Sequence, residues 1–295
     1  MYYIIYPIFY LLSLLPWRVM YWIGDGIYVL MYHIIGYRRE VVMKNLLIAF
    51  PEKTPEERRE ISRQFYHNLA DTFAETIKLL SLSEKSLAKR YQANSEVLYD
   101  FYDSGRNIQL HAGHFFNIEF VTQGETQSNK KYPLVAVYMP LSSKAFDRIM
   151  FNLRSRYGGI LIPAADFKAG FKDYVCGRYA LALAADQNPP NPAAAHWIRF
   201  FDRPTPFSTG PEKGARNHNT VVIFANFYRE KRGHFRMHYE VMAGNPNELK
   251  EGELTRLFVK QVEKAIRERP ANYLWSHRRW KWEFCAEKHK HLMLE

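Results

Sequence analysis

The segment Asn107-Ile-Gln-Leu-His-Ala-Gly-His-Phe-Phe-Asn-Ile-Glu-Phe120 changes its pattern within a few residues. It opens on the short apolar run Asn107–Leu110 and passes through His111 and His114 before a helical pattern begins. A β-rich run that leads through a polar turn into a helix is typical of an α/β unit. The segment therefore predicts one strand of an α/β sheet, with polar side chains where that strand ends.

The alternation of strands and helices continues along the chain. Five further runs are predicted as strands: Leu134–Tyr138, Gly159–Ile162, Tyr179–Ala184, Val221–Phe227 and Phe235–Met242. Helical patterns lie at Ser83–Tyr91, Ser142–Tyr157, Phe167–Cys176 and Glu251–Glu268, and Thr54-Pro55 is a helix N-terminus signal. This order predicts a central, mostly parallel sheet flanked by helices. We expect residues 46–295 to form a single domain, with a helical lead-in over 51–100 and the α/β core over 101–295.

The N-terminus has a different character. Residues 1–17 carry no charged side chain, and the apolar run 19–37 is interrupted by Asp25. Pro7 and Asp25 make two clean membrane spans improbable, so an interfacial or partly inserted helix pair fits better. Arg38 and Arg39 follow, and such basic flanks favour the cytoplasmic side. We therefore expect residues 1–45 to be a helical membrane-associating segment; the alternative is two buried helices of a soluble protein.

The composition restricts the function classes. Lys and Arg number 41 against 30 acidic residues, a net charge of +11, and 20 Tyr, 20 Phe and 6 Trp suit contact with lipid. The positive charge attracts anionic partners such as acidic phospholipids or an acidic carrier protein. No recognisable nucleic-acid-binding module is present, so nucleic acid is not expected. The only cysteines, Cys176 and Cys285, exclude a zinc ribbon or a disulfide framework.

The candidate chemistry lies in His114 and Glu119. Histidine suits a general base that takes a hydroxyl proton near neutral pH, and a carboxylate on its second ring nitrogen would fix the tautomer. Five residues along an ideal helix turn through about 140°, so His114 is expected on the loop and Glu119 one turn inside. A metal site of His111, His114 and Glu119 is a minor alternative. No Gly-rich phosphate loop or G-x-S-x-G elbow is present.

Several blocks resemble one family. His114-Phe-Phe-Asn-Ile-Glu119 is similar to the H-x-G-N-W-E block of the bacterial lipid A biosynthesis acyltransferases, late enzymes of the lysophospholipid acyltransferase superfamily. Further blocks resemble that family in the same order: Tyr37–Pro51, Leu153–Gly158, Ala184–Gln187, Phe200–Pro211 and Arg269–Lys281. The resemblance extends over nearly the whole chain and is far more specific than the His-x4-Glu spacing alone.

The resemblance implies an O-acyltransferase of the inner membrane with its catalytic domain on the cytoplasmic face. It would move an acyl chain from an acyl-carrier-protein thioester to a hydroxyl of a lipid A precursor, and no cofactor is expected. Arg154 and Arg156 resemble the arginines that meet acceptor phosphate or the thioester oxygen, and a planar, permanently charged fork suits both tasks. Asp186 follows a predicted strand, where α/β sites form. Asn117 completes the set of expected substrate-binding residues.

Two departures from the family pattern keep alternatives open. Phe116-Asn117-Ile118 stands where the family commonly has Gly-Asn-Trp, and Asp202 replaces a Gly. Bulkier residues beside the catalytic pair would reshape the acceptor pocket. The alternatives are an acyltransferase acting on a lysophospholipid or an acylated amino-acid lipid, and a non-enzymatic peripheral lipid-binding protein.

Overall fold

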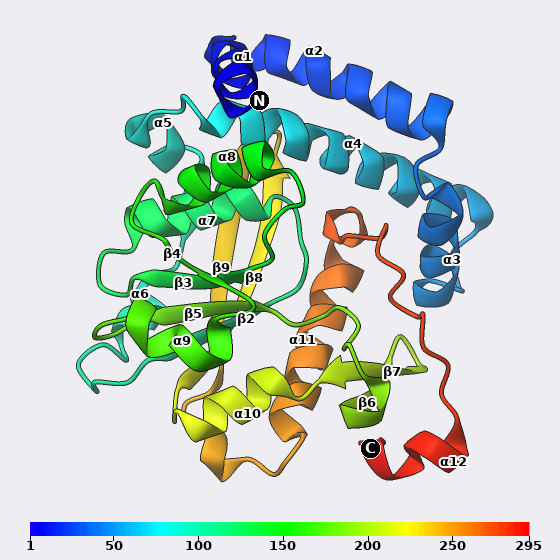
Figure 1. The fold of residues 1–295 in the computed structure, drawn as a ribbon. Coiled ribbons are helices and arrows are strands. Elements are labelled where there is room, and N and C mark those ends of the chain that lie inside the picture. The colour runs from blue at the N-terminus through cyan, green and yellow to red at the C-terminus, as the bar shows by residue number, and fades with distance from the viewer. Residues whose placement is uncertain (295) are drawn as a thin grey trace.

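The computed structural model describes residues 1–294, and a seven-stranded sheet forms its centre (Figure 1). The strand order is β1-β9-β8-β2-β5-β3-β4, and all neighbours run parallel except β8 and β9. The strands are β1 (Tyr91–Ala93), β2 (Ile108–Ala112), β3 (Leu134–Tyr138), β4 (Ile160–Pro163), β5 (Ala180–Ala184), β8 (Val221–Lys231) and β9 (His234–Ala243). The predicted mostly parallel α/β sheet is confirmed.

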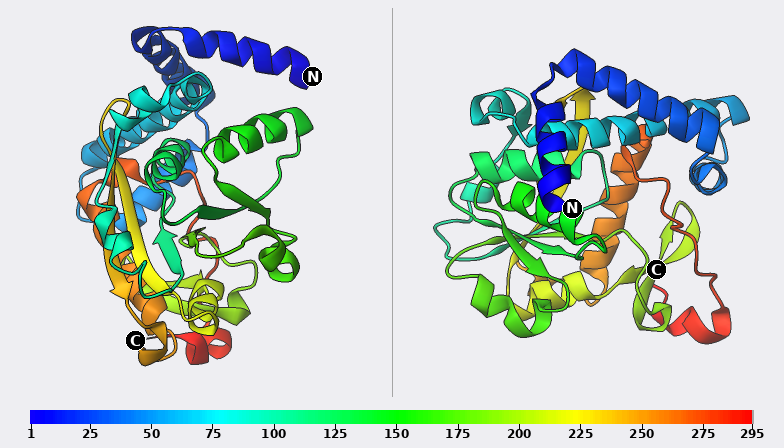
Figure 2. Two further views of the ribbon diagram at one scale, coloured as in Figure 1. Left: turned by 90° about the vertical axis from the view of Figure 1, so that its left-hand side faces the viewer. Right: turned by 45° about the horizontal axis from the view of Figure 1, so that its top comes forward.

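Helices cover both faces of the sheet (Figure 2). On one face, Phe120 of α7 (Ile118–Ser128) contacts Phe235 of β9, with ring centroids 4.7 Å apart. On the other face, Phe258 of α11 (Glu253–Glu268) lies against Phe224 of β8. The other α-helices of the described chain after the N-terminal pair are α3 (Arg39–Ala49), α4 (Pro55–Leu79), α5 (Glu84–Ala88), α6 (Glu96–Tyr99), α8 (Lys144–Ser155), α9 (Phe167–Tyr174), α10 (Gly210–Asn217) and α12 (Ala286–His289).

The two N-terminal helices pack on the rest of the chain. α1 (Tyr2–Leu14) and α2 (Trp17–Tyr28) are followed by a π-helical turn, Val29–Ile35. No single helix among residues 1–294 is long and apolar enough to cross a bilayer. Only α1 and the helix Trp17–Ile35 together have the length and apolar composition of a span, and they are bent by 118° at the break between them. The predicted N-terminal helix pair is therefore present.

The charge inside the second apolar run has a specific partner. Asp25 of α2 pairs with Arg232, which lies in the tight turn between β8 and β9. Arg232 also reaches Asp71 of α4, with its Nη2 2.7 Å from a carboxylate oxygen. Asp25 thus ties α2 to the β8–β9 turn.

Some local features were missed. The helix expected over Ser83–Tyr91 ends at Ala88, because Tyr91 pairs with Phe235 and opens β1. A two-stranded hairpin, β6 (Ala195–Phe200) and β7 (Arg203–Ser208), was not predicted from the proline-rich stretch that contains it. A strand of a two-stranded hairpin is an edge strand, where proline is tolerated.

Candidate active site

Two adjacent parallel strands bring the central pair of side chains together. β2 and β5 are in register with Ala112 opposite Ala184. His114 and Asp186 each lie two residues beyond that pair, at the carboxyl edge of the sheet. Nδ1 of His114 is 2.6 Å from Oδ1 of Asp186, and the backbone N–H of His114 donates to the same oxygen at 3.1 Å. The carboxylate therefore fixes both the ring and the backbone of His114.

The loop that carries His114 is held by a segment from the far end of the sequence. The N–H of Phe116 donates to the carbonyl of Asn272 at 3.0 Å, and the N–H of Leu274 donates to the carbonyl of His114 at 3.0 Å. Phe115 and Tyr273 form an antiparallel bridge between these two bonds. The Arg269–Lys281 block thus acts as a clamp on the loop, which limits how far the imidazole can move.

The electrostatics suit a histidine that cycles between neutral and charged forms. The Asp186 side chain is fully buried, whereas 28% of the His114 side chain is exposed. Burial lowers the pKa of His114, but the charge and hydrogen bond of Asp186 outweigh it, so this pKa lies above 6.5. Burial likewise raises the pKa of Asp186, and His114 more than compensates, so this pKa lies below 3.8. Because the carboxylate occupies Nδ1, the proton stays there and Nε2 is the basic nitrogen.

Glu119 has a different partner from the one expected. It lies in the first turn of α7, and its carboxylate forms a two-bond fork with Arg154 of α8, with Nε 2.9 Å from Oε2. The carboxylate against the second ring nitrogen of His114 is Asp186. The reason is geometric: the register of β2 and β5 places Asp186 beside His114, while α7 carries Glu119 toward α8.

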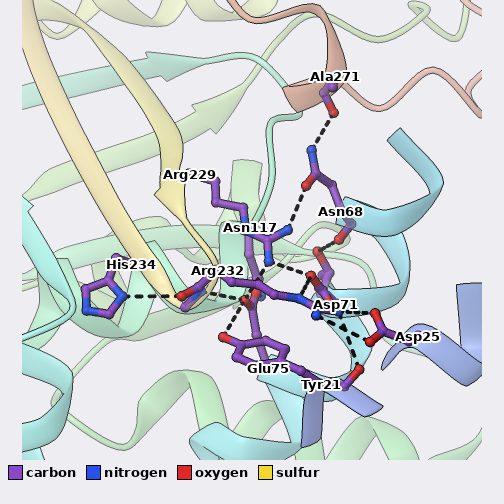
Figure 3. A network of polar contacts seen from close by, with 12 residues as sticks. Tyr21, Asp25, Asn68, Asp71, Glu75, Asn117, Arg229, Arg232, His234 and Ala271 are labelled. Atoms are coloured by element: carbon purple, nitrogen blue, oxygen red, sulfur yellow. Dashed lines mark hydrogen bonds and ion pairs between the residues drawn. The ribbon is translucent and has the colours of Figure 1, made fainter. Parts of the chain in front are cut away.

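Asn117 is buried and supports the start of α7. Its side-chain oxygen accepts from the N–H groups of Glu119 and Phe120 at 3.0 and 3.3 Å, which caps the helix. Its amide donates to Glu75 of α4 at 3.1 Å. Glu75 belongs to a buried network that joins α2, α4 and the β8–β9 hairpin (Figure 3). The structure therefore places Asn117 under the site as a support, rather than on its exposed surface.

Comparisons with known proteins identify the family of the chain. The model of the family of bacterial lipid A biosynthesis acyltransferases matches residues 1–282. The chain belongs to this family. It is 24% identical over 280 residues to the lipid A biosynthesis lauroyltransferase of Escherichia coli K12, covering 93% of this chain and 89% of that protein. It is 21% identical over 270 residues to the lipid A biosynthesis palmitoleoyltransferase of the same strain, covering 90% of this chain and 86% of the relative. A lipid A biosynthesis acyltransferase of Shigella flexneri matches equally well.

The two arginines of the Leu153–Gly158 block lie in different places. Arg154 reaches the first turn of α7 through Glu119. Arg156 points back to α4, where it donates to the carbonyl of Leu79 at 2.8 Å. The structure brings Arg154 to the same helix start that follows His114, but it does not bring Arg156 there.

The closing block of this acyltransferase contributes mainly to the core. Trp275 and Arg279 are almost completely buried, and Arg279 donates to the carbonyl of Pro206 at 2.9 Å and to Asn188 at 3.0 Å. Its guanidinium lies 4.2 Å from the ring centroid of Phe207. Burial lowers the pKa of Arg279 to about 10. These contacts make the Arg279 side chain a buried support of the Arg269–Lys281 clamp.

The metal alternative has no geometric support among residues 1–294. No cluster of three or more His, Cys, Asp or Glu side chains in that range is arranged to hold an ion. Nε2 of His111 instead lies 2.9 Å from the side-chain amide of Gln109. Burial lowers the pKa of His111 to about 4, so this ring is neutral under physiological conditions.

Proposed function

We propose that this acyltransferase moves a fatty acyl chain from an acyl-carrier-protein thioester to a hydroxyl of a lipid A precursor, with His114 as the general base and Asp186 as its orienting carboxylate. The observation that carries the proposal is the 2.6 Å contact between a buried Asp186 and a partly exposed His114 at the carboxyl edge of parallel strands. Ligands of open α/β sheets bind at this edge.

The reaction follows from the two ring nitrogens. Nε2 of His114 takes the proton of the acceptor hydroxyl as its oxygen attacks the thioester carbonyl. The imidazolium that forms is stabilised by Asp186, which stays ionised because its pKa is low. The tetrahedral intermediate collapses with cleavage of the C–S bond, and His114 returns the proton to the departing thiolate. The products are an ester and a free thiol, and His114 ends neutral.

The Glu119–Arg154 pair is proposed to serve the substrate rather than the imidazole. The Arg154 side chain is 28% exposed and that of Glu119 is 12% exposed, so the arginine is the more accessible partner of the pair. A guanidinium held by two bonds keeps its remaining N–H groups in a fixed direction. We propose that Arg154 binds an anionic oxygen, either acceptor phosphate or the developing oxyanion, and that Arg156 does not.

The cellular setting is proposed from charge and composition. The net charge of +11 favours an acidic carrier protein as donor and an anionic membrane surface as the place of action. The N-terminal helices over residues 1–45 would hold the catalytic domain, residues 46–295, on the cytoplasmic face of the inner membrane. No cofactor is required by this chemistry.

A direct test compares acceptors. Purified protein in detergent is given a radiolabelled acyl-carrier-protein thioester with a lipid A precursor, a lysophospholipid or an acylated amino-acid lipid, and the products are separated by chromatography. We expect ester formation on the lipid A precursor and loss of about 10²–10⁴ in rate in His114→Ala, the usual contribution of a positioned base. Faster transfer to either other lipid would replace the acceptor assignment. Absence of transfer to all three would favour a lipid-binding protein without catalysis.

A further inference from the structure

The helix α8 and the loop before it expose large apolar side chains among polar ones. Four large side chains, which together we call the α8 apolar surface, are exposed: Met139 (74%), Leu141 (47%), Phe146 (39%) and Phe151 (40%). The inner side of the same helix packs on the domain through the buried residues Ala145, Ile149 and Leu153. A helix on the surface of a water-soluble domain normally turns polar side chains outward. The exposed part of the α8 apolar surface is therefore available to a partner.

This surface is continuous with the N-terminal helix. The rings of Phe9 and Phe146 lie 5.8 Å apart between centroids, and the Arg148 guanidinium stacks 4.3 Å from the ring of Tyr2. Figure 2 shows α1 and α8 side by side. α1 has no charged side chain, and several of its apolar residues are more than half exposed: Tyr3, Ile4, Ile8, Leu11 and Leu14.

The surface also lies next to the catalytic edge. The loop with Met139 and Leu141 follows the carboxyl end of β3, which is parallel to β5 and two strands from β2. The last turn of α8 carries Arg154, which forms the fork with Glu119. The loop and helix that carry the exposed apolar residues thus also carry a residue of the candidate site.

The charges around this surface identify its partner. Lys144 and Arg148 are exposed beside the apolar residues, whereas Asp147 is turned back and accepts from the N–H of Leu141 at 2.8 Å. An apolar surface with cationic neighbours matches an anionic phospholipid leaflet, where apolar groups enter the acyl region and cations meet head groups.

We propose that the α8 apolar surface inserts into the phospholipid leaflet beside α1, as a second membrane contact in addition to the N-terminal helices. This contact holds the catalytic edge against the head-group layer, so the acceptor lipid reaches His114 from the plane of the membrane with its chains still in the leaflet. The inference rests on the proposed lipid acceptor, but the membrane contact can be measured without any transfer reaction.

A fluorescent probe tests the contact. An environment-sensitive fluorophore is attached to Leu141→Cys in full-length protein, in a background where Cys176 and Cys285 are replaced by Ser. Vesicles of phosphatidylethanolamine and phosphatidylglycerol are then added. We expect a blue shift of the emission and quenching by lipids brominated on their acyl chains.

Two labelled positions serve as controls. Ile8→Cys on α1 is the positive control. Val241→Cys is the negative control, an exposed apolar position on β9. It lies seven residues, or roughly 20 Å, along the strand from His234, the end of β9 nearest α2. A probe there should show no shift. A probe at Leu141 that stays water-exposed while Ile8 enters the membrane overturns the proposal. So does a blue shift at Leu141 that appears without vesicles and grows with protein concentration, because that indicates a second copy of the chain.

An activity experiment separates this inference from the proposed function. The double variant M139E/L141E should lose about tenfold or more in transfer to an acceptor embedded in vesicles, since each buried apolar side chain contributes on that order to partitioning. It should keep near-normal transfer to the same acceptor in detergent micelles. His114→Ala should fail in both. Equal loss of the double variant in vesicles and micelles would contradict the membrane role and leave the catalytic assignment intact.

Discussion

Replacing Glu75 with Gln tests the buried network beneath the catalytic loop. Glu75 is 1% exposed and accepts hydrogen bonds from Asn117 at 3.1 Å, from the N–H of Gly233 at 3.1 Å and from Tyr21 at 3.3 Å (Figure 3). Its nearest cation, Arg229, is 3.6 Å away. Burial outweighs these contacts and raises the pKa of Glu75 from 4.5 to about 7.

The pKa shift fixes the sign and size of a stability effect. Below pH 4.5 Glu75 is protonated in both folded and unfolded chains. Between pH 4.5 and about 7 the unfolded carboxyl ionises while the folded one keeps its proton, so stability falls as the pH rises. The rise of the Glu75 pKa from 4.5 to about 7 corresponds to a loss of about 3 kcal/mol of unfolding free energy across this pH window.

Gln removes the titration but not the packing. Its single oxygen can accept from Asn117 or from Gly233 but not from both, which costs about 1–3 kcal/mol at every pH. E75Q should therefore be less stable than the wild type at pH 5 and approach or exceed it at pH 8. The assay is denaturant unfolding in detergent at several pH values, and the quantity compared is the difference between the two proteins, in which other titrating groups cancel.

Glu212 supplies a control of opposite sign. It is also buried, but hydrogen bonds from Thr255, Gly252 and Arg216 overcome burial and lower its pKa below 4.5. Its contribution is present above the unfolded pKa of 4.5 and is lost in acid, so the deficit of Glu212→Gln should grow as pH rises toward 4.5 and stay constant across pH 5–8. If the wild type and E75Q show parallel stability curves across pH 5–8, Glu75 does not titrate in this window and the account of the network is refuted.

Three further predictions concern the site and its donor. Arg154→Lys keeps the charge but loses the fork and should lower the transfer rate by about tenfold or more, whereas Arg156→Lys should stay near the wild-type rate. Asn117→Ala removes a helix cap and the donor to Glu75, so it should lower the unfolding free energy by about 1–3 kcal/mol and slow transfer. Its control, Ser83→Ala, removes the cap of α5 and should lower the unfolding free energy by about 1 kcal/mol without slowing transfer. At equal chain length, the carrier-protein thioester should be used more efficiently than acyl-coenzyme A, and raised salt should reduce that efficiency.

Each of these predictions has a contradicting result. Equal losses in the two arginine variants would remove Arg154 from the site. A fast but destabilised Asn117→Ala would show that the start of α7 does not control the reaction. Equal or better use of acyl-coenzyme A would overturn the carrier-protein donor and leave the base assignment untouched.

The strands and helices of the core were largely predictable because their signals are local. Apolar runs and caps such as Thr54, whose hydroxyl accepts from the N–H of Glu57 at 3.2 Å, depend on neighbouring residues only. β8 extends to Lys231, four residues beyond its predicted end, because pairing with β9 stabilises a polar continuation of the strand. Pairing between distant strands is not encoded in any single window.

In the candidate site, too, local sequence signals were predictable and contacts between distant segments were not. His114 and the strand-end position of Asp186 followed from the sequence, but their contact depends on β5 lying beside β2, 72 residues away along the chain. Glu119 was assigned to the imidazole because it is near in sequence, whereas the fold turns it toward Arg154. Glu75 carried no sequence signal, because its role comes from burial and from contacts with three separate elements.

The pH dependence of kcat/KM in Asp186→Asn and Glu119→Gln tests the central claim most directly. The wild-type rate should rise with pH through the raised pKa of His114, because only the neutral ring acts as a base. In Asp186→Asn the charge that raises the pKa of His114 is gone, and burial still lowers this pKa. The acidic limb should therefore move to lower pH, and the plateau rate should fall by about 10²–10⁴. Glu119→Gln should lower the rate and leave the limb in place. A limb that moves in Glu119→Gln and stays in Asp186→Asn would contradict the account and return Glu119 to the imidazole.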